Sequence, residues 1–166
     1  MTHIPVQQLS REAFLPFGSY AQMLNPNTLK FGEEPLEFYR DMVQFDLGTT
    51  SRASYSICRI LKREPVVDLL EQHSHSDEVM LPLDGDMVLQ VGPATPPGEV
   101  PYDRLEAFYV PQGTLIGMKP GVWHYGPFAV NTDCVNILVV LPERTYANDC
   151  EVVTLKPEQQ VRIDGI

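Results

Sequence analysis

The sequence has no long hydrophobic run and little positive charge. No stretch approaches the roughly 18 apolar residues of a membrane-spanning helix, and the first residues, MTHIPVQQLSREAF, lack the charged start and apolar stretch of a secretion signal. Twelve Lys and Arg against twenty-two Asp and Glu give a net charge of −10, which repels phosphate backbones and anionic membranes. We therefore expect a soluble, cytoplasmic protein that binds no nucleic acid and no membrane, and whose partners are small molecules or proteins.

Cysteine is scarce and shows no functional spacing. Cys58, Cys134 and Cys150 are odd in number, far apart and not arranged as CxxC. This pattern predicts neither a disulfide framework nor a thiolate zinc site. Cys58 and Cys134 fall inside apolar runs, which favours a role as core-filling side chains. We interpret all three cysteines as free thiols.

Patterns typical of long helices are missing as well. Fifteen prolines and eleven glycines punctuate the chain, and from Glu37 onward the apolar residues form short runs rich in Val, Ile, Tyr and Phe. The Asp84-Gly85 dipeptide between two such runs favours a β-hairpin. About eight or more short strands predict an all-β sandwich or barrel, organised as one domain over residues 1–166. The exception is LSREAF, Leu9 to Phe14, where Ser10 can cap a short N-terminal helix.

Histidine is also rare, and its placement is the clearest functional signal. The chain has four histidines, and two of them, His73 and His75, lie one residue apart in EQHSHSDEVMLPLDG. In an extended strand alternate residues face the same side, so their imidazoles are predicted to converge. Glu78 can join them if the chain bends at Ser76 and Asp77, and His124, after a Pro-Gly turn, can supply a third nitrogen. Such a set suits one divalent transition metal (Mn, Fe, Co, Ni, Cu or Zn) with positions left open for a substrate.

Two segments resemble the motifs of the cupin superfamily. HSHSDEVMLPLDG resembles the first cupin motif, and GTLIGMKPGVWH, which ends at His124, resembles the second. The resemblance implies a cupin-like β-barrel (a double-stranded β-helix, or jelly roll). It also implies metal binding through His73, His75, Glu78 and His124. Fewer residues separate His75 from Glu78 than is usual in cupins, and Asp77 is the substitute ligand.

A closer resemblance, to the ureidoglycolate lyase family (formerly ureidoglycolate hydrolases), extends over most of the chain. It is carried by the segments LSREAFLPFG, SICR, the H-x4-E step with VMLPLDG, LEAFYV, GVWHYGPF and NDCE, in that order. It implies cleavage of ureidoglycolate to glyoxylate and urea in allantoin breakdown, and a homodimer. The chain departs from the family pattern at Ser74, His75 and Glu78, which strengthens a metal site. It departs again at residues 117–119, where Gly-Met-Lys replaces the family's usual Asn-Tyr-His segment; this departure removes side chains that are expected to touch the substrate.

The expected reaction assigns further residues. Elimination from an α-hydroxy acid such as ureidoglycolate needs the hydroxyl deprotonated, the departing nitrogen protonated and the carboxylate held; a metal would lower the hydroxyl pKa. For the proton transfers we predict Glu78 if it is not a ligand, and otherwise Asp77 or Lys119. The substrate-binding candidates are Arg59 first and Arg40 second, because a guanidinium suits bidentate carboxylate recognition, together with Trp123 and Tyr125.

Each assignment has a structural alternative. The histidine pair can face solvent, Arg59 can be a salt-bridged structural arginine, and Lys119 can be a surface lysine. Glu71 and Asp68 are interpreted as a solvated edge. Two other functions remain open: a metal cupin of another reaction type, such as an oxygenase or isomerase acting on a different small carboxylate, and a non-catalytic cupin that binds a ligand.

Overall fold

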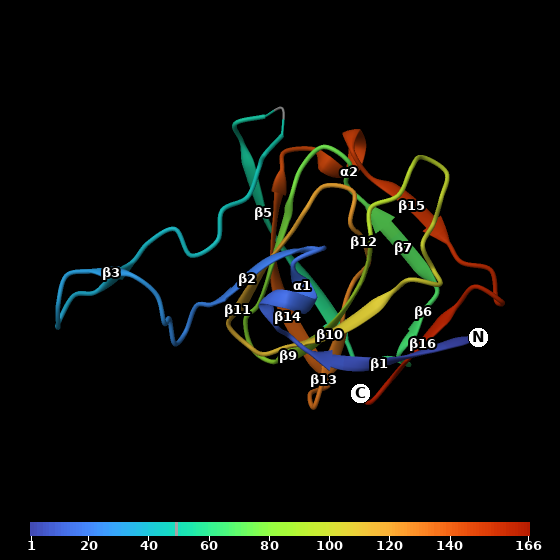
Figure 1. Cartoon of the computed structure of the whole chain (residues 1–166), viewed down its shortest axis with the longest axis horizontal. Coiled ribbons are helices and arrows are strands. Elements are labelled where there is room, and N and C mark those ends of the chain that lie inside the picture. Colours follow the sequence, from blue (N-terminus) through green and yellow to red (C-terminus); the bar gives the residue numbers. More distant parts are fainter. Residues whose placement is uncertain (49) are drawn as a thin grey trace.

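The computed structural model describes residues 1–48 and 50–166 as a curled β structure with a long projecting segment (Figure 1). The two helices of the described residues are single turns, α1 (Arg11–Phe14) and α2 (Thr145–Asn148). Ser10 begins α1 by accepting a hydrogen bond from the Ala13 N–H, as its sequence position predicts. The predicted cupin-like β-barrel with a short N-terminal helix is confirmed. No described helix has the length and apolar character needed to cross a membrane.

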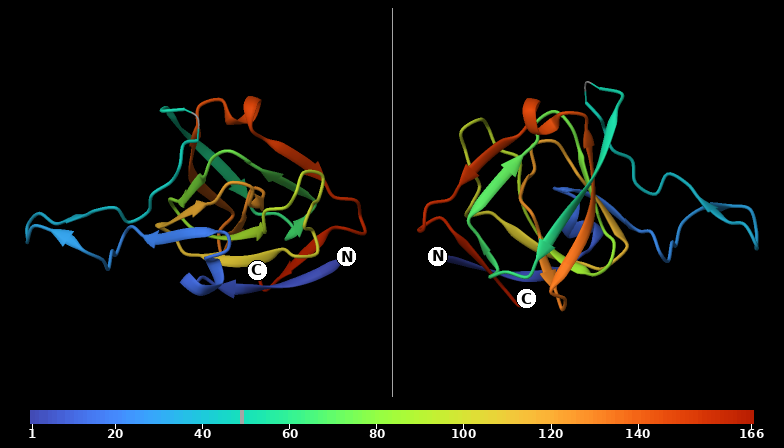
Figure 2. Two further views of the ribbon diagram at one scale, coloured as in Figure 1. Left: turned by 45° about the horizontal axis from the view of Figure 1, so that its top comes forward. Right: turned by 180° about the vertical axis from the view of Figure 1, so that it is seen from behind.

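The strands form two main sheets that curl toward each other (Figure 2). Within the described chain, the smaller sheet has five strands in the order β2 (Gly18–Gln22), β11 (Thr114–Met118), β8 (Glu78–Pro82), β14 (Cys134–Pro142) and β5 (Ala53–Leu61). The larger sheet has nine, in the order β15 (Glu151–Thr154), β7 (Leu69–Gln72), β12 (Trp123–His124), β9 (Asp86–Gly92), β10 (Glu106–Val110), β1 (Thr2–Gln8), β16 (Val161–Asp164) and β6 (Val66–Val67), with β13 (Phe128–Val130) also pairing with β9. A separate pair, β3 (Lys30–Phe31) and β4 (Phe38–Tyr39), lies in the projecting segment.

The larger sheet buries apolar side chains on both of its faces. Along β9, Met87, Leu89 and Val91 belong to the cluster between the two sheets, whereas Val88 belongs to a second cluster. This alternation follows from the two-residue period of a strand. Side chains from both sheets fill the first cluster, and the second contains Trp123. The sequence forms a β-barrel because its short apolar runs can cover both faces in this way.

The connection from β7 to β8, residues 73–77, carries the predicted histidine pair and is held by Asp149. The Asp149 carboxylate accepts hydrogen bonds from the Ser74 N–H (2.8 Å), the Ser74 hydroxyl (2.8 Å) and the His75 N–H (2.9 Å). Burial alone raises the pKa of Asp149, but the hydrogen bonds from His75 and Ser74 outweigh it and bring the pKa to about 2. The charged carboxylate therefore fixes this connection against the end of α2.

We expect Asp149→Asn to lower the free energy of unfolding by about 1–3 kcal/mol at neutral pH, because it weakens several charge-assisted hydrogen bonds. The pKa of Asp149 falls from 3.8 to about 2 on folding. Its contribution is therefore fully present above the unfolded value and is lost as the pH falls through the folded one. Urea unfolding over that pH range measures the difference between the variant and the unmodified chain. Asp103→Asn, at an exposed site, is the control, and a difference that does not shrink with falling pH would contradict the assignment.

Candidate functional site

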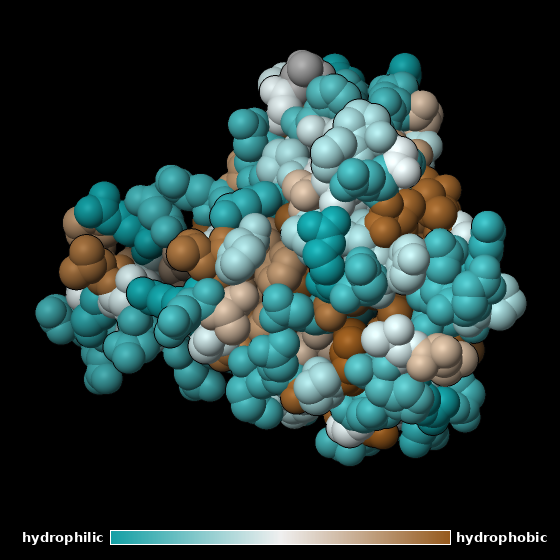
Figure 3. Space-filling model, turned by 45° about the vertical axis from the view of Figure 1, so that its right-hand side comes forward, coloured by the Kyte–Doolittle hydropathy of each residue, from teal (hydrophilic) through white to brown (hydrophobic). Residues whose placement is uncertain are grey.

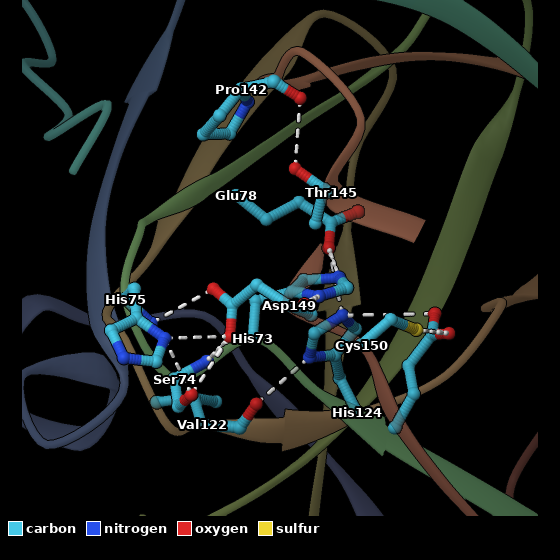
Figure 4. Close-up of polar contacts among 11 residues, drawn as sticks. His73, Ser74, His75, Glu78, Val122, His124, Pro142, Thr145, Asp149 and Cys150 are labelled. Atoms are coloured by element: carbon cyan, nitrogen blue, oxygen red, sulfur yellow. Dashed lines mark hydrogen bonds and ion pairs between the residues drawn. The ribbon is translucent and has the colours of Figure 1, made fainter. Parts of the chain in front are cut away.

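The buried polar groups of the barrel meet where the two sheets approach each other (Figure 4). Glu71 lies in β7, His73 directly follows that strand, and His124 ends β12. His124 pairs with Glu71 across neighbouring strands of the larger sheet. Glu78 is the first residue of β8 in the smaller sheet. The cluster therefore draws side chains from both sheets and depends on closure of the barrel.

Glu78 lies between the two imidazoles. Its Oε2 atom is 3.0 Å from His73 Nε2 and 2.8 Å from His124 Nε2, and all three side chains are at least 95% buried (exposed fractions 5%, 2% and 2%). Glu71 completes the group, because ligand atoms of Glu71, His73 and His124 lie within 4.8 Å of one another. This is a compact set of two nitrogen and two carboxylate donors.

Both imidazoles are oriented by backbone carbonyls. His73 Nδ1 lies 2.6 Å from the Asp149 carbonyl oxygen, and His124 Nδ1 lies 2.9 Å from that of Val122. A carbonyl oxygen only accepts, so each Nδ1 carries the hydrogen and donates it. The Nε2 atoms are thereby directed at the carboxylates. Metal-binding histidines commonly have such a partner on the other ring nitrogen.

The charged groups of the cluster strongly affect one another's pKa values. Burial alone raises the pKa of Glu78, but His124 and His73 outweigh it and lower the pKa to about 2. Burial alone lowers the pKa of His124, but the charge and hydrogen bond of Glu78 raise it to about 8. The pKa of His73 is also raised, because Glu78 outweighs the effect of burial. A buried negative charge here favours a bound cation, either a proton or a metal ion.

The donor set fits a metal ion. Among the described residues His73 Nε2 has no hydrogen-bond partner of good geometry, although Glu78 Oε2 is 3.0 Å away. Ligand atoms of Glu71, His73 and His124 lie close enough together to hold an ion, and Glu78 contacts both imidazoles. Imidazole nitrogens and carboxylate oxygens are donors that a divalent transition metal takes.

A pocket of about 720 Å³ opens onto this cluster. Glu71 and Glu78 line it together with Tyr125, Tyr146 and Arg63, and residues from Cys58 onward in β5 form a wall.

Arg63 provides a fixed positive charge in this pocket. One of its terminal nitrogens donates to the carbonyl oxygens of Gly126 (2.6 Å) and Pro127 (3.3 Å). Its guanidinium carbon lies 3.9 Å from the centre of the Phe128 ring. The pocket thus holds a positioned cation near a carboxylate–imidazole cluster, an arrangement suited to a small anionic ligand.

The structure brings together three of the four predicted metal ligands, His73, Glu78 and His124, but not His75. The His75 side chain is 73% exposed, and its Nδ1 atom lies 3.0 Å from Asp149. Strand β7 ends at Gln72, so the alternation that was expected to align His73 with His75 instead aligns His73 with Glu71. Glu71 is not part of a solvated edge as expected, since its side chain is only 17% exposed.

Two predicted catalytic residues lie elsewhere. Asp77 accepts a hydrogen bond from the Asp46 N–H at 2.8 Å, and Lys119 donates to the Leu15 carbonyl at 2.6 Å. Neither residue lines the pocket beside Glu71. Each of these side chains therefore has a structural partner outside the cluster.

Among the predicted substrate-binding residues, Tyr125 and Arg59 line the pocket. The Arg59 Nε atom also donates to Asn136 Oδ1 at 2.9 Å. Arg40 stacks on Phe31 in the projecting segment, 4.5 Å from the ring centre. Trp123 is buried in the second core cluster, where its indole N–H donates to the Thr95 hydroxyl at 2.8 Å.

Sequence reasoning missed Arg63 and Tyr146. The only signal for Arg63 was its position in a basic stretch, RILKR, of an acidic chain. Tyr146 lies in α2, two residues before the NDCE segment begins, and it lines the pocket in the folded chain. Neither role follows from spacing along the chain.

Comparison with known proteins agrees with this architecture. A family model described as ureidoglycolate lyase matches residues 1–162. The ureidoglycolate lyase of Burkholderia cepacia is 27% identical over 156 residues, which are 91% of this chain and 85% of the relative. That of Rhodobacter capsulatus is 29% identical over 126 residues, 75% of this chain and 77% of the relative.

Among solved structures, a dTDP sugar isomerase from Desulfovibrio desulfuricans G20 resembles the fold. It superposes with a TM-score of 0.53 at 14% identity, covering 86% of this chain and 85% of the other. This likeness concerns the fold alone. The family match extends over nearly the whole sequence, and it includes both β7 and β12, which carry the cluster. The chain belongs to the ureidoglycolate lyase family.

Proposed function

We propose that this chain cleaves ureidoglycolate, or a closely related small hydroxy acid, to glyoxylate and urea with the help of one divalent metal ion. The observation that carries the proposal is a pocket lined by a fixed arginine and by Glu78, the carboxylate of a buried His-Glu-His cluster. The substrate presents matching groups, since it combines a hydroxyl that can be deprotonated with a carboxylate that an arginine can bind.

We assign the metal to His73, Glu78 and His124. When bound, a divalent ion would lower the pKa of the substrate hydroxyl and stabilise the negative charge that develops on its oxygen. The backbone carbonyls of Val122 and Asp149 hold both imidazoles in the required orientation. Identity of the metal depends on availability as much as on affinity, so Mn, Fe, Co, Ni and Zn remain candidates.

Arg63 is assigned to the substrate carboxylate. Its contacts with Gly126, Pro127 and Phe128 occupy one terminal nitrogen and one face of the guanidinium. A guanidinium has five N–H donors in a fixed plane, so others stay free for a carboxylate. Because its supports are already in place, Arg63 would lose little conformational entropy when the substrate binds.

Glu71 is assigned to the proton transfers. It lines the pocket and lies beside the cluster, 3.9 Å from His124 Nε2, while Glu78 is held between two imidazoles with a pKa of about 2. A carboxylate that is strongly stabilised in its charged form is a poor base. Glu71 would take the hydroxyl proton as the C=O bond of glyoxylate forms. The C–N bond breaks with its electron pair moving to nitrogen, and the proton passes to that nitrogen to give urea.

The direct test is turnover under anaerobic conditions. Metal-loaded protein is expected to release urea and glyoxylate in equal amounts from ureidoglycolate. A requirement for O₂ would instead favour an oxygenase of the same fold, and absence of turnover with intact metal binding would favour a ligand-binding role.

The expected homodimer remains a prediction, and exposed apolar surface on the projecting segment supports it.

Metal content tests whether His75 is a ligand, as the sequence predicted, or lies outside the ligand set, as the structure indicates. We expect about one metal ion per chain after loading with Mn²⁺ or Zn²⁺ and desalting, as measured by elemental mass spectrometry. His73→Ala and Glu78→Gln should abolish binding, because each removes a donor from the buried cluster. His75→Ala is the matched control and should keep the metal. Equal loss in the His73 and His75 variants, with folding verified by circular dichroism, would contradict the assignment.

Glu71→Gln should lower kcat by about 10²–10⁴-fold while leaving the metal content unchanged, because the amide cannot accept a proton. Steady-state kinetics and elemental analysis on the same preparation measure both effects. Glu151→Gln, a neighbouring acidic position outside the pocket, serves as the control. A Glu71→Gln variant with normal kcat would show that another group transfers the proton.

Arg63→Met should lower kcat/KM by about 10–100-fold, which corresponds to losing one charge-assisted hydrogen bond. The comparison is Arg59→Met, which removes a guanidinium that is bound to Asn136 instead. Competition by simple carboxylates such as glyoxylate should weaken in parallel only for the Arg63 variant. If Arg59→Met lowered kcat/KM more than Arg63→Met does, Arg59 would be the residue that binds the carboxylate.

A further inference from the structure

The segment from residue 27 to residue 41, called the arm here, extends away from the barrel (Figures 1 and 2). It contains β3 and β4 and exposes four large apolar side chains: Leu29 (77%), Phe31 (55%), Leu36 (78%) and Phe38 (61%). No residue of the arm belongs to either core cluster of the described chain. Figure 3 shows hydrophobic side chains on the surface of this projecting part, at the left of the view.

The two faces of the arm differ in polarity. Lys30 is paired with Tyr39 across β3 and β4, and both contact Glu37. Phe31 is paired with Phe38 in the same register, so these rings share the other face, where the Arg40 guanidinium stacks on Phe31. An isolated two-stranded hairpin is marginally stable in water. A hairpin with paired exposed phenylalanines therefore indicates a surface that becomes covered by a partner.

A complementary surface lies on β5. This strand ends the smaller sheet and pairs only with β14 in the described chain. Its outward side chains include Tyr55, Ile57 and Leu61, which are 73%, 58% and 64% exposed. They alternate with Cys58 and Ile60, which pack against the core between the sheets. We call this outward row the β5 face.

The two surfaces also carry opposite charge. Residues 52–62, around the β5 face, contain three basic and no acidic residues, although the whole chain has a net charge of −10. The arm has two basic residues, Lys30 and Arg40, and four acidic ones, Glu33, Glu34, Glu37 and Asp41, so its net charge is 2 − 4 = −2. Charge complementarity of this kind guides one surface to the other.

We propose that the arm of one chain packs on the β5 face of a second copy, and that the exchange is reciprocal. Both complementary surfaces are present on the same chain, which is the requirement for an isologous two-fold dimer. The apolar face formed by Phe31 and Phe38 covers Tyr55, Ile57 and Leu61 of the partner. The acidic tip of the arm lies against the basic residues around β5. This assignment does not depend on the reaction that the pocket carries out.

The first experiment measures mass in solution by light scattering coupled to size exclusion. The unmodified chain is expected to be a dimer. Phe31→Asp/Phe38→Asp on the arm and Ile57→Asp/Leu61→Asp on the β5 face should each raise the dimer dissociation constant by about 30-fold or more. All four side chains are exposed, so thermal unfolding should confirm intact folding. Leu15→Asp alters an apolar residue that is equally exposed but lies on neither surface, and should leave the dimer unchanged.

A mixing experiment identifies which surfaces meet. The arm variant keeps an intact β5 face, and the β5 variant keeps an intact arm. An equimolar mixture should therefore form a heterodimer through one restored arm-to-face contact, although each variant alone is monomeric. A monomeric unmodified chain, or double variants that remain dimeric, would overturn the proposal. Monomers that do not associate on mixing would also overturn it, because they would indicate arm-to-arm or face-to-face contacts.

Discussion

The site depends on one buried carboxylate that is shared by two imidazoles. Glu78 comes from the smaller sheet, and His73 and His124 come from the larger one. Removing a carboxylate from water costs several kcal/mol, so it is tolerated in a core only when a positive partner lies in direct contact. The contact that satisfies this charge also joins the two sheets. The side chains of the site therefore come together only when the two sheets close into the barrel.

The surroundings of the cluster explain why it keeps its shape. Backbone carbonyls from Asp149 and Val122 fix both rings, and the Asp149 carboxylate also fixes the connection between β7 and β8. All of these supports come from the chain itself. Side chains that are held in this way lose less conformational entropy when a ligand binds.

Two of the few basic residues of this acidic chain, Arg63 and Arg59, make different contacts. Arg63 lines the pocket, where the Phe128 ring and two carbonyls hold its guanidinium. Arg59, on the same stretch of chain, donates to Asn136. The end of β5 at Leu61 separates these roles, because Arg59 lies within the strand whereas Arg63 lies beyond it. One basic segment can thus serve both a ligand pocket and an interaction surface.

The sequence by itself determined the fold class and part of the site. Short apolar runs with frequent Pro and Gly specify strands locally, and the spacing of the histidines and Glu78 predicted a metal site that included His75. Tertiary structure decided the rest. Whether Glu71 or His75 lies beside His73 depends on β7 ending at Gln72, and the position of Arg63 at the pocket depends on where β5 ends. Strand ends are set by pairing with distant segments, and this long-range pairing cannot be read from residue spacing.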